Sequence, residues 1–515
     1  MSDTETSHQA SQAYETAVRR RTLIAMILAS GTVFLQSTVV NVALPRIGEA
    51  LEAGLSGLQW IVDGYILTLA ALLITGGSLG DRYGRRKVMT VGLIGFGITS
   101  IACAAAPTTA WLIGARVLQG VTGAMMVPGA LAIIRAVYTD PERRGKAIGQ
   151  WSGWSGITTV IGPLVGGWLV DTLSWRWVFL ISVPFIVATV WLMLTAVPES
   201  RDEDAPERLD WIGAALVGLG LAGLAYGLIE GPVQGWGAVP VILALAGGAV
   251  ALIAFPFYER RIDEPMVPLE IFRVRNFTGA NLATLGVYFA LQGMSFFLVI
   301  FMQNVMGFSA LIAGLVLAPT SLLLLLLSPR FGELANRYTP RLFMTLGPIV
   351  CGIGLLLFAG LEPDSGFWTG ILPGVLVFGL GMAGTVAPLT DTVMSAVTDR
   401  HSGIAAAFNN VVSRVAGLLA VAGLGIVLTA TFTASLDRRT RDLSLSESDA
   451  QTLTRIAEEP TGSLDVAQLP PEAGRAVRRA FTDGFRRVMI ATAVMAFAGG
   501  GISALIIRKK SEDTG

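Results

Sequence analysis

The sequence is a succession of long apolar runs that carry almost no charge. One run is uncharged from Thr22 to Pro45, and a later one is uncharged from Asn276 to Pro329. A helix needs about 20 apolar residues to cross the hydrocarbon core of a bilayer. Charged residues make up only 14% of the chain, against about 25% in a soluble domain. These features exclude a soluble fold and predict an all-α integral membrane protein.

Fourteen runs are long enough to be spans. The run from Asn276 to Pro329 is too long for one helix, and we split it between Asn304 and Ser309, where turn-forming residues gather. The first run is longer than the apolar region of a secretory signal, so we expect it to be retained. The expected spans are 22–44, 57–79, 88–106, 110–134, 147–170, 176–197, 211–230, 239–257, 277–302, 309–329, 342–361, 367–392, 404–432 and 488–507.

Lysine and arginine residues orient these spans, because cytoplasmic loops carry an excess of them. With the N-terminus in the cytoplasm, the short outer loops contain only Arg46 and Arg176. A long outer segment, about Thr433 to Arg487, also carries arginines. It does not contradict this orientation, because long segments are translocated largely regardless of charge. An even number of spans returns the basic residues 508–510 to the cytoplasm, so we expect both termini there.

An internal repeat links two distant loops. The loop after the second span reads GSLGDRYGRRK from Gly77, and the loop after the tenth reads GELANRYTPR from Gly332. When Gly77 is aligned with Gly332, the Leu, Arg, Tyr and final Arg coincide. The repeat predicts two similar halves, spans 1–6 and 9–14, with spans 7 and 8 inserted between them. Parallel halves of six spans are typical of transporters.

Five motifs resemble those of the major facilitator superfamily, and in particular its fourteen-span drug:proton antiporters of the multidrug efflux type. The loop from Gly77 resembles the superfamily's cytoplasmic signature GxLxDRxGRR. The others are, in chain order, LQSTVVNVALP from Leu35, LIGARVLQG from Leu112, GPLVGG from Gly162 and SWRWVF from Ser174. The resemblance covers all fourteen spans. It implies a major facilitator fold in a bacterial-type inner (cell) membrane. It also implies that transport is powered by the proton motive force and needs no cofactor.

The repeat and the resemblance divide the chain into two six-helix bundles and two inserted helices. We expect a cytoplasmic N-tail at 1–21, bundles at 22–200 and 261–507, inserted helices at 201–260, and a cytoplasmic C-tail at 508–515. The second bundle includes the extracellular segment 433–487, where we expect short helices around 446–458 and 471–487. This segment either caps the outer mouth or is merely tolerated there.

The loop after span 2 has two interpretations. Its positive charge alone holds the topology. The resemblance implies, in addition, a conformational latch formed by Gly77, Asp81, Arg82, Gly84 and Arg85. Asp81 is then expected at the positive N-terminus of span 13, near residue 403, and Arg82 and Arg85 are expected to pair with acids. Such a latch biases a conformational equilibrium without touching the substrate.

Gly162, Pro163, Gly166 and Gly167 make up the motif in span 5 that is associated with antiporters. Glycine lets two helices approach closely, and proline removes a hydrogen bond and bends a helix. The motif therefore indicates either simple close packing or a hinge that prevents leakage between the two halves.

Charged residues within spans are costly, so they are candidates for function. The helical rise places Gln36, Asp63 and Arg116 about 9–12 Å from the outer edge. We expect Asp63 and Arg116 to face the interior and interact, with Gln36 nearby; alternatively, Asp63 is hydrated at the interface. The family usually has an acid where this chain has Gln36, which cannot release a proton. Either Asp63 or Asp391 then carries the proton, or coupling is weak, or the substrates differ.

A second group of polar residues lies in spans 12 and 13. Asn410 and Arg414 are four residues apart and share a helix face. We expect Asp391 to pair with Arg414 across the two spans. The two residues either form a structural ion pair, or Asp391 is a proton carrier whose pKa responds to Arg414 and to the substrate.

The expected substrate cavity is lined by Gln36, Asn41, Gln292, Phe296 and Asn410. Phe296 belongs to an aromatic stripe in span 9. Such a stripe either packs the bundle or stacks on a flat or cationic drug.

The leading hypothesis is a secondary active exporter that moves small amphipathic drugs or antibiotics in exchange for protons. Alternatives are export of an endogenous lipid or metabolite and, in a different class, a non-transporting receptor or scaffold. The sequence has no GxxxxGK[ST] loop for ATP and no nucleophile–base pattern, so we expect no enzyme activity. The chain has only two histidines, so we expect no metal site. Its net charge is zero, so we expect no nucleic-acid partner. We expect a monomer in the lipid bilayer.

Overall fold

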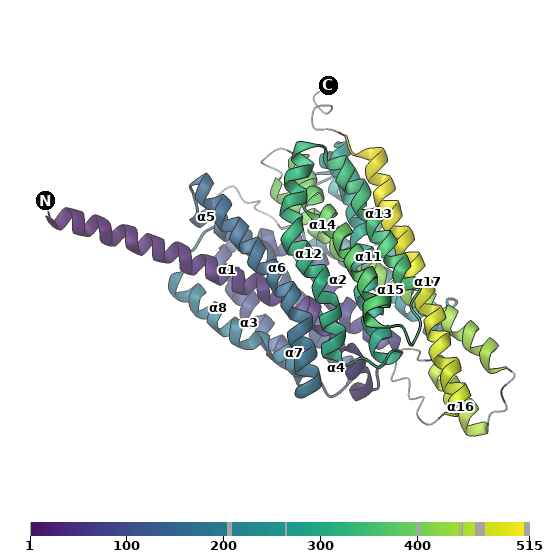
Figure 1. Ribbon diagram of the computed structural model, residues 1–515. Helices are drawn as coiled ribbons and strands as arrows, with labels where there is room; N and C mark the ends of the chain where they lie inside the picture. Colours follow the sequence, from purple (N-terminus) through teal and green to yellow (C-terminus); the bar gives the residue numbers. More distant parts are fainter. Residues whose placement is uncertain are drawn as a thin grey trace.

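The computed structural model describes residues 2–202, 209–262, 265–397, 402–441, 443, 446–458 and 469–508. Every regular element in these residues is a helix, and the long helices lie side by side in one bundle (Figure 1). The predicted all-helical architecture is therefore confirmed for the described part of the chain. The predicted C-terminal tail lies outside it beyond residue 508.

The first group of helices corresponds to predicted spans 1–6. It comprises α1 (Ser2–Leu51), α2 (Leu55–Tyr83), α3 (Arg85–Ala104), α4 (Thr109–Ala124), α5 (Val127–Val137), α6 (Pro141–Thr172), α7 (Trp177–Leu180) and α8 (Ser182–Ala196). Helix α1 includes the polar residues before the first apolar run. Predicted span 4 is divided into α4 and α5, because Pro128 in the first turn of α5 supplies no backbone N–H.

Two helices follow, as the sequence predicts, between the two groups. They are α9 (Trp211–Gln234) and α10 (Val239–Glu259). Helix α9 packs against α2 and α15, whereas α10 packs almost entirely on α9. Only 11% of the most apolar stretch of α10 is buried, and its exposed side chains include Leu243 and Val250. A helix that is apolar all round and exposed is suited to contact with lipid.

The second group contains the helices of the C-terminal half. They are η1 (Leu269–Arg273), α11 (Arg275–Asn304), α12 (Ala310–Arg337), α13 (Pro340–Ala359), η2 (Phe367–Ile371), α14 (Leu372–Ser395), α15 (Ser402–Thr440), α16 (Glu447–Glu458) and α17 (Pro471–Ile506). The predicted break between spans 9 and 10 is confirmed, as is the short helix α16. The expectation of a separate short helix at 471–487 is wrong, because these residues are the first half of α17.

Thirteen helical segments of the described residues are long and apolar enough to cross a membrane, when α4 is counted with α5, α7 with α8, and η2 with α14. Helix α6, which corresponds to predicted span 5, is not among them, although its 32 residues exceed the length that a crossing needs. The structure therefore supports an all-helical membrane protein with thirteen candidate spans.

The two groups of helices touch through α6 and α12, α2 and α15, and α1 and α11. Glycines bring α6 and α12 together. A Cβ at Gly167 would lie 2.6 Å from the Ala310 carbonyl oxygen, and a Cβ at Gly314 would collide with the Pro163 carbonyl. No larger side chain fits at this crossing without moving a helix.

Candidate functional site

A cavity of about 550 Å³ lies between the two groups of helices. It is at the end of the bundle where α2 ends and α3 begins, which we name the α2–α3 end. The opposite end, where α1 ends and α2 begins, we name the α1–α2 end. The cavity is lined mainly by α1, α2 and α5 from the first group and by α15 from the second, with polar residues that include Ser30, Thr75, Ser78, Asp81, Arg85, Arg135, Asp202, Asp210 and Asn410.

The deep part of the cavity is apolar with a few polar groups. Val33, Phe34 and Leu73 line it. The Trp151 indole donates a hydrogen bond to Ser30 Oγ across α6 and α1, at 2.9 Å. An apolar cavity with a few fixed polar groups is the usual form of a small-molecule site.

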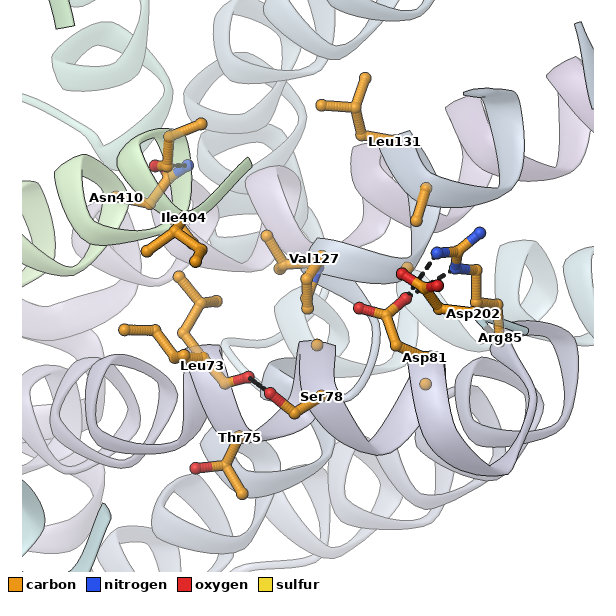
Figure 2. Close-up of a pocket in the computed structure, with 18 of the residues that line it drawn as sticks. Leu73, Thr75, Ser78, Asp81, Arg85, Val127, Leu131, Asp202, Ile404 and Asn410 are labelled. Carbon is orange, nitrogen blue, oxygen red and sulfur yellow. Dashed lines mark hydrogen bonds and ion pairs between the residues drawn. The ribbon is translucent and has the colours of Figure 1, made fainter. Parts of the chain in front are cut away.

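The predicted latch residues lie at the mouth of this cavity. Arg85 forms an ion pair with Asp81, one turn away, at 2.7 Å, and Figure 2 shows both side chains on one side of the cavity. Gly84 joins α2 to α3 with a φ of 107°, a conformation that favours glycine. The Arg82 guanidinium lies 5.3 Å from the centre of the Tyr83 ring, and Gly77 packs on Pro128.

The start of α15 lines the other side of the same cavity. Ile404 and Asn410 lie across it from Asp81 and Arg85 (Figure 2). In this conformation the Asp81 carboxylate is therefore held by Arg85 at the start of α3, within the same group of helices. Its predicted position at the N-terminus of α15 remains a prediction for a conformation in which the cavity is closed.

Glu199 is a residue of this region that the sequence did not indicate. Its carboxylate accepts hydrogen bonds from the backbone N–H of Arg86 at 2.9 Å and of Lys87 at 3.2 Å. It thus stabilises the positive N-terminal end of α3. The only signal available was an acid at the start of an acid-rich loop after a span, and nothing in that pattern marks one acid among several.

Asp63 and Arg116 are both buried, but their predicted interaction is wrong. Arg116 donates to the Ile61 carbonyl oxygen at 2.9 Å and to Gln119 Oε1 at 2.7 Å, and its guanidinium lies 4.2 Å from the centre of the Tyr65 ring. Asp63 is fully buried, and neither of its carboxyl oxygens has a hydrogen-bond partner among the described residues. The alternative that Asp63 is hydrated at an interface is also wrong.

Gln36 contacts the first group of helices and does not line the cavity. Its amide donates to the Val178 carbonyl at 2.9 Å and to Ser182 Oγ at 3.2 Å. Ser182 is bonded to Ser100 at 3.3 Å, and Ser100 accepts from Gln119 at 2.8 Å. A buried chain of hydrogen bonds thus connects Gln36 with the partner of Arg116.

In the second group, the predicted ion pair between Asp391 and Arg414 is wrong. Asp391 is exposed, Arg414 is half-buried, and neither takes part in an ion pair of the described residues. Asn410 lines the cavity. Its neighbour Asn409, which the sequence did not single out, donates to Asn281 Oδ1 at 3.1 Å and to Thr284 Oγ1 at 2.7 Å.

Three other residues predicted for the cavity lie away from its lining. Phe296 is fully buried, 4.9 Å from the Phe297 ring between centres. Gln292 packs against Gly417 of α15, and Asn41 is 6% exposed on α1. In this conformation Phe296 has a packing role, in line with the alternative interpretation of the aromatic stripe.

The glycines of the GPLVGG motif pack against two different helices. A Cβ at Gly162 would collide with Thr38 of α1, and one at Gly166 would meet Val39 at 2.5 Å. Gly167 and Pro163 instead contact α12. Asp171, one turn further along α6, accepts hydrogen bonds from the first backbone N–H groups of α12. The motif therefore lies where α6 contacts both its own group of helices and the other.

Comparisons with known proteins agree with this arrangement. Residues 26–421 match the family model of the Major Facilitator Superfamily. The chain is 35% identical to the tetracenomycin C resistance and export protein of Streptomyces glaucescens, over 79% of this chain and 75% of that protein. It is also 35% identical to the multidrug resistance protein Stp of Mycobacterium tuberculosis, over 81% and 77% of the two chains.

A similar fold is found among solved structures. A bacterial homologue of the human lysosomal transporter Spinster, crystallised in an inward-facing and unoccupied conformation, superposes with a TM-score of 0.68. The match covers 95% of this chain and 97% of that one at 18% sequence identity. At this identity the likeness concerns the fold alone.

Proposed function

Because the chain belongs to the Major Facilitator Superfamily and is a multi-pass membrane transporter, we propose that it exports small amphipathic compounds, antibiotics among them, in exchange for protons. The observation that carries this proposal is the cavity between the two groups of helices, which lies at one end of the bundle only. A binding space that reaches one side of the membrane at a time is what alternating access requires.

The contacts at the α1–α2 end support an alternating mechanism. Asp171 of α6 binds the start of α12, and Gln303 of α11 donates to the Val42 carbonyl of α1 at 3.0 Å. Gln59 of α2 likewise donates to the Val421 carbonyl of α15. All three contacts join the two groups, so they must break when the α1–α2 end opens.

We place the α2–α3 end in the cytoplasm, with both termini there, because most lysines and arginines gather at that end. This placement needs an even number of crossings. Helix α6 supplies the fourteenth, since it packs between α1 and α12 and is long enough to span. The membrane is then a bacterial inner membrane, as expected from bacterial relatives, and the cavity is open to the side from which an exporter loads.

We propose that Asp63 binds and releases the proton that is exchanged for the substrate. Its carboxyl group is fully buried between helices and has no hydrogen-bond donor among the described residues. A buried carboxylate without a donor is costly, and a proton removes that cost. Gln36 cannot take this role, because it cannot ionise and its amide is already bonded to Val178 and Ser182.

The relatives favour antibiotics over an endogenous lipid or metabolite as the cargo. The two relatives are named for tetracenomycin C resistance and export and for multidrug resistance. The apolar deep part of the cavity suits such compounds, with Trp151 and Phe34 as flat surfaces. We expect the same cavity to accept an aromatic dye.

Efflux from proteoliposomes tests the proposal. The full chain is reconstituted with an imposed pH gradient and loaded with tetracenomycin C, ethidium or a phospholipid analogue. We expect gradient-driven transport of the first two compounds and no transport of the lipid. Transport that continues unchanged after a protonophore collapses the gradient contradicts proton exchange, and transport of the lipid alone contradicts the proposed cargo.

A further inference from the structure

Two acidic side chains face each other at the ends of the inserted helices, at the α2–α3 end. Asp210 begins α9, and its Oδ1 accepts a hydrogen bond from the Gly213 N–H at 2.7 Å. Glu259 ends α10 and is 2% exposed. Their remaining oxygens, Asp210 Oδ2 and Glu259 Oε1, receive no hydrogen bond from any described residue.

Both of these oxygens lie close to Gly213. A Cβ at residue 213 would collide with Asp210 Oδ2 and would lie 2.9 Å from Glu259 Oε1. Both oxygens are therefore close to one point beside Gly213. Ionised carboxylates only accept hydrogen bonds, so a hydrogen bond between the two groups requires a proton on one of them.

We propose that Asp210 and Glu259 share one bound proton, and that they form a proton-binding site on the inserted helices, separate from Asp63. Two negative charges so close together and away from water repel each other strongly, and a single proton both removes one charge and supplies a donor between the two carboxyl groups. Glycine at position 213 is required, because any side chain there would fill the space in which the two oxygens meet.

Among the described residues, no cation is paired with either acid. The Tyr258 hydroxyl is a hydrogen-bonding neighbour of Asp210, but it is neutral at ordinary pH and cannot balance either charge. Arg260 and Arg261 follow Glu259 in the sequence, but no ion pair of the described residues involves either acid. Across the cavity, the Asp81 carboxylate is paired with Arg85.

The shared proton holds together two parts of the cavity wall. Glu259 Oε2 accepts a hydrogen bond from the Val267 N–H at 3.3 Å, in the connection that leads from α10 to η1. Asp210 and Met266 both line the cavity. When the proton leaves, repulsion from Asp210 drives the Glu259 carboxylate out of its buried position, and the Val267 N–H loses its acceptor.

Hydrogen exchange of the Met266 and Val267 amides tests the site in the full-length protein in lipid nanodiscs. The exchange rates are divided by those of an unstructured peptide of the same sequence at each pH. We expect protection of these amides to fall about tenfold between about pH 5 and pH 9, because a hydrogen bond to a carboxyl group is lost.

Two variants make the test specific. In Glu259→Gln the side-chain amide donates to Asp210 Oδ2 without a proton, while its oxygen still accepts from Val267, so protection should become independent of pH. Glu270→Gln is the matched control, since Glu270 is an exposed acid nearby in η1, and it should behave as the wild type does. Wild-type protection that does not vary with pH overturns the proposal, as does a pH dependence that persists in Glu259→Gln.

A cation is the competing occupant. If Na⁺ or Ca²⁺ added at high pH restores the protection of these amides in the wild type, the pair binds a cation and the proposed proton site is wrong. The effect on transport rests on the proposed function: export should depend on internal pH less steeply in Glu259→Gln than in the wild type, because only the dependence that arises from Asp63 remains. If neither protein exports any compound, the proposed function fails while the exchange result stands.

Discussion

The Asp171 carboxylate binds the first turn of α12 through the backbone N–H of Leu311 at 2.8 Å and that of Ala310 at 3.1 Å. Asp171 lies at the end of α6 in the first group of helices, and Ala310 and Leu311 are the first two residues of α12 in the second. A negative charge at the N-terminus of a helix is stabilised by the helix dipole and by N–H groups that have no partner within the helix. The contact therefore favours the conformation that is closed at the α1–α2 end.

Replacement of Asp171 by alanine should shift the protein toward the conformation that is open at the α1–α2 end. Both charge-assisted hydrogen bonds are lost, so we expect a shift of about tenfold in the ratio of the two conformations. Distances between spin labels on α6 and α12 at that end measure this ratio. Asp364→Ala is the control, because Asp364 is an exposed acid at the same end that takes part in no ion pair of the described residues. Unchanged distances in Asp171→Ala would show that the contact does not influence the equilibrium.

Enlarging Gly167 should separate α6 from α12. A Cβ at this position would lie 2.6 Å from the Ala310 carbonyl oxygen, and overpacking of this kind costs about 1–3 kcal/mol. We expect Gly167→Ala to lower the thermal unfolding midpoint and the export rate together. Gly153→Ala is the control on the same helix, since a Cβ there would meet no atom within 4 Å. Equal export by the two variants contradicts a role for this crossing.

Hydropathy predicted where the helices lie, because burial in lipid imposes a length and a composition on each of them. It could not predict how each helix is rotated. Asp63 and Arg116 were placed at one depth, yet Arg116 turns toward Gln119 and Tyr65. The carboxylates that bind backbone groups, at Glu199 and Asp171, were also missed. Their partners are N–H groups, which every residue except proline possesses, so no residue pattern marks them.

Removal of the Asp63 carboxyl should abolish the coupling of export to protons. Asp63→Asn keeps the size of the side chain but cannot bind and release a proton. We expect this variant to bind substrate with unchanged affinity and to lose gradient-driven export from proteoliposomes. Asp391→Asn should keep that export, because Asp391 is exposed and is not paired with Arg414. The reverse result would show that Asp391, and not Asp63, carries the exchanged proton.

Introduction of an acid at position 36 should destabilise this protein. The Gln36 amide donates to the carbonyl oxygens of Val178 and Phe179, at 2.9 and 3.3 Å, and to Ser182. A glutamate would place an ionised oxygen against two acceptors, which costs about 1–3 kcal/mol. A protonated glutamic acid still donates one hydrogen bond, so the loss should be small at low pH and should grow as the pH rises. Thermal unfolding of Gln36→Glu and of the wild type over a range of pH measures this difference. A constant difference at every pH would indicate that packing, and not the hydrogen bonds of Gln36, sets the cost.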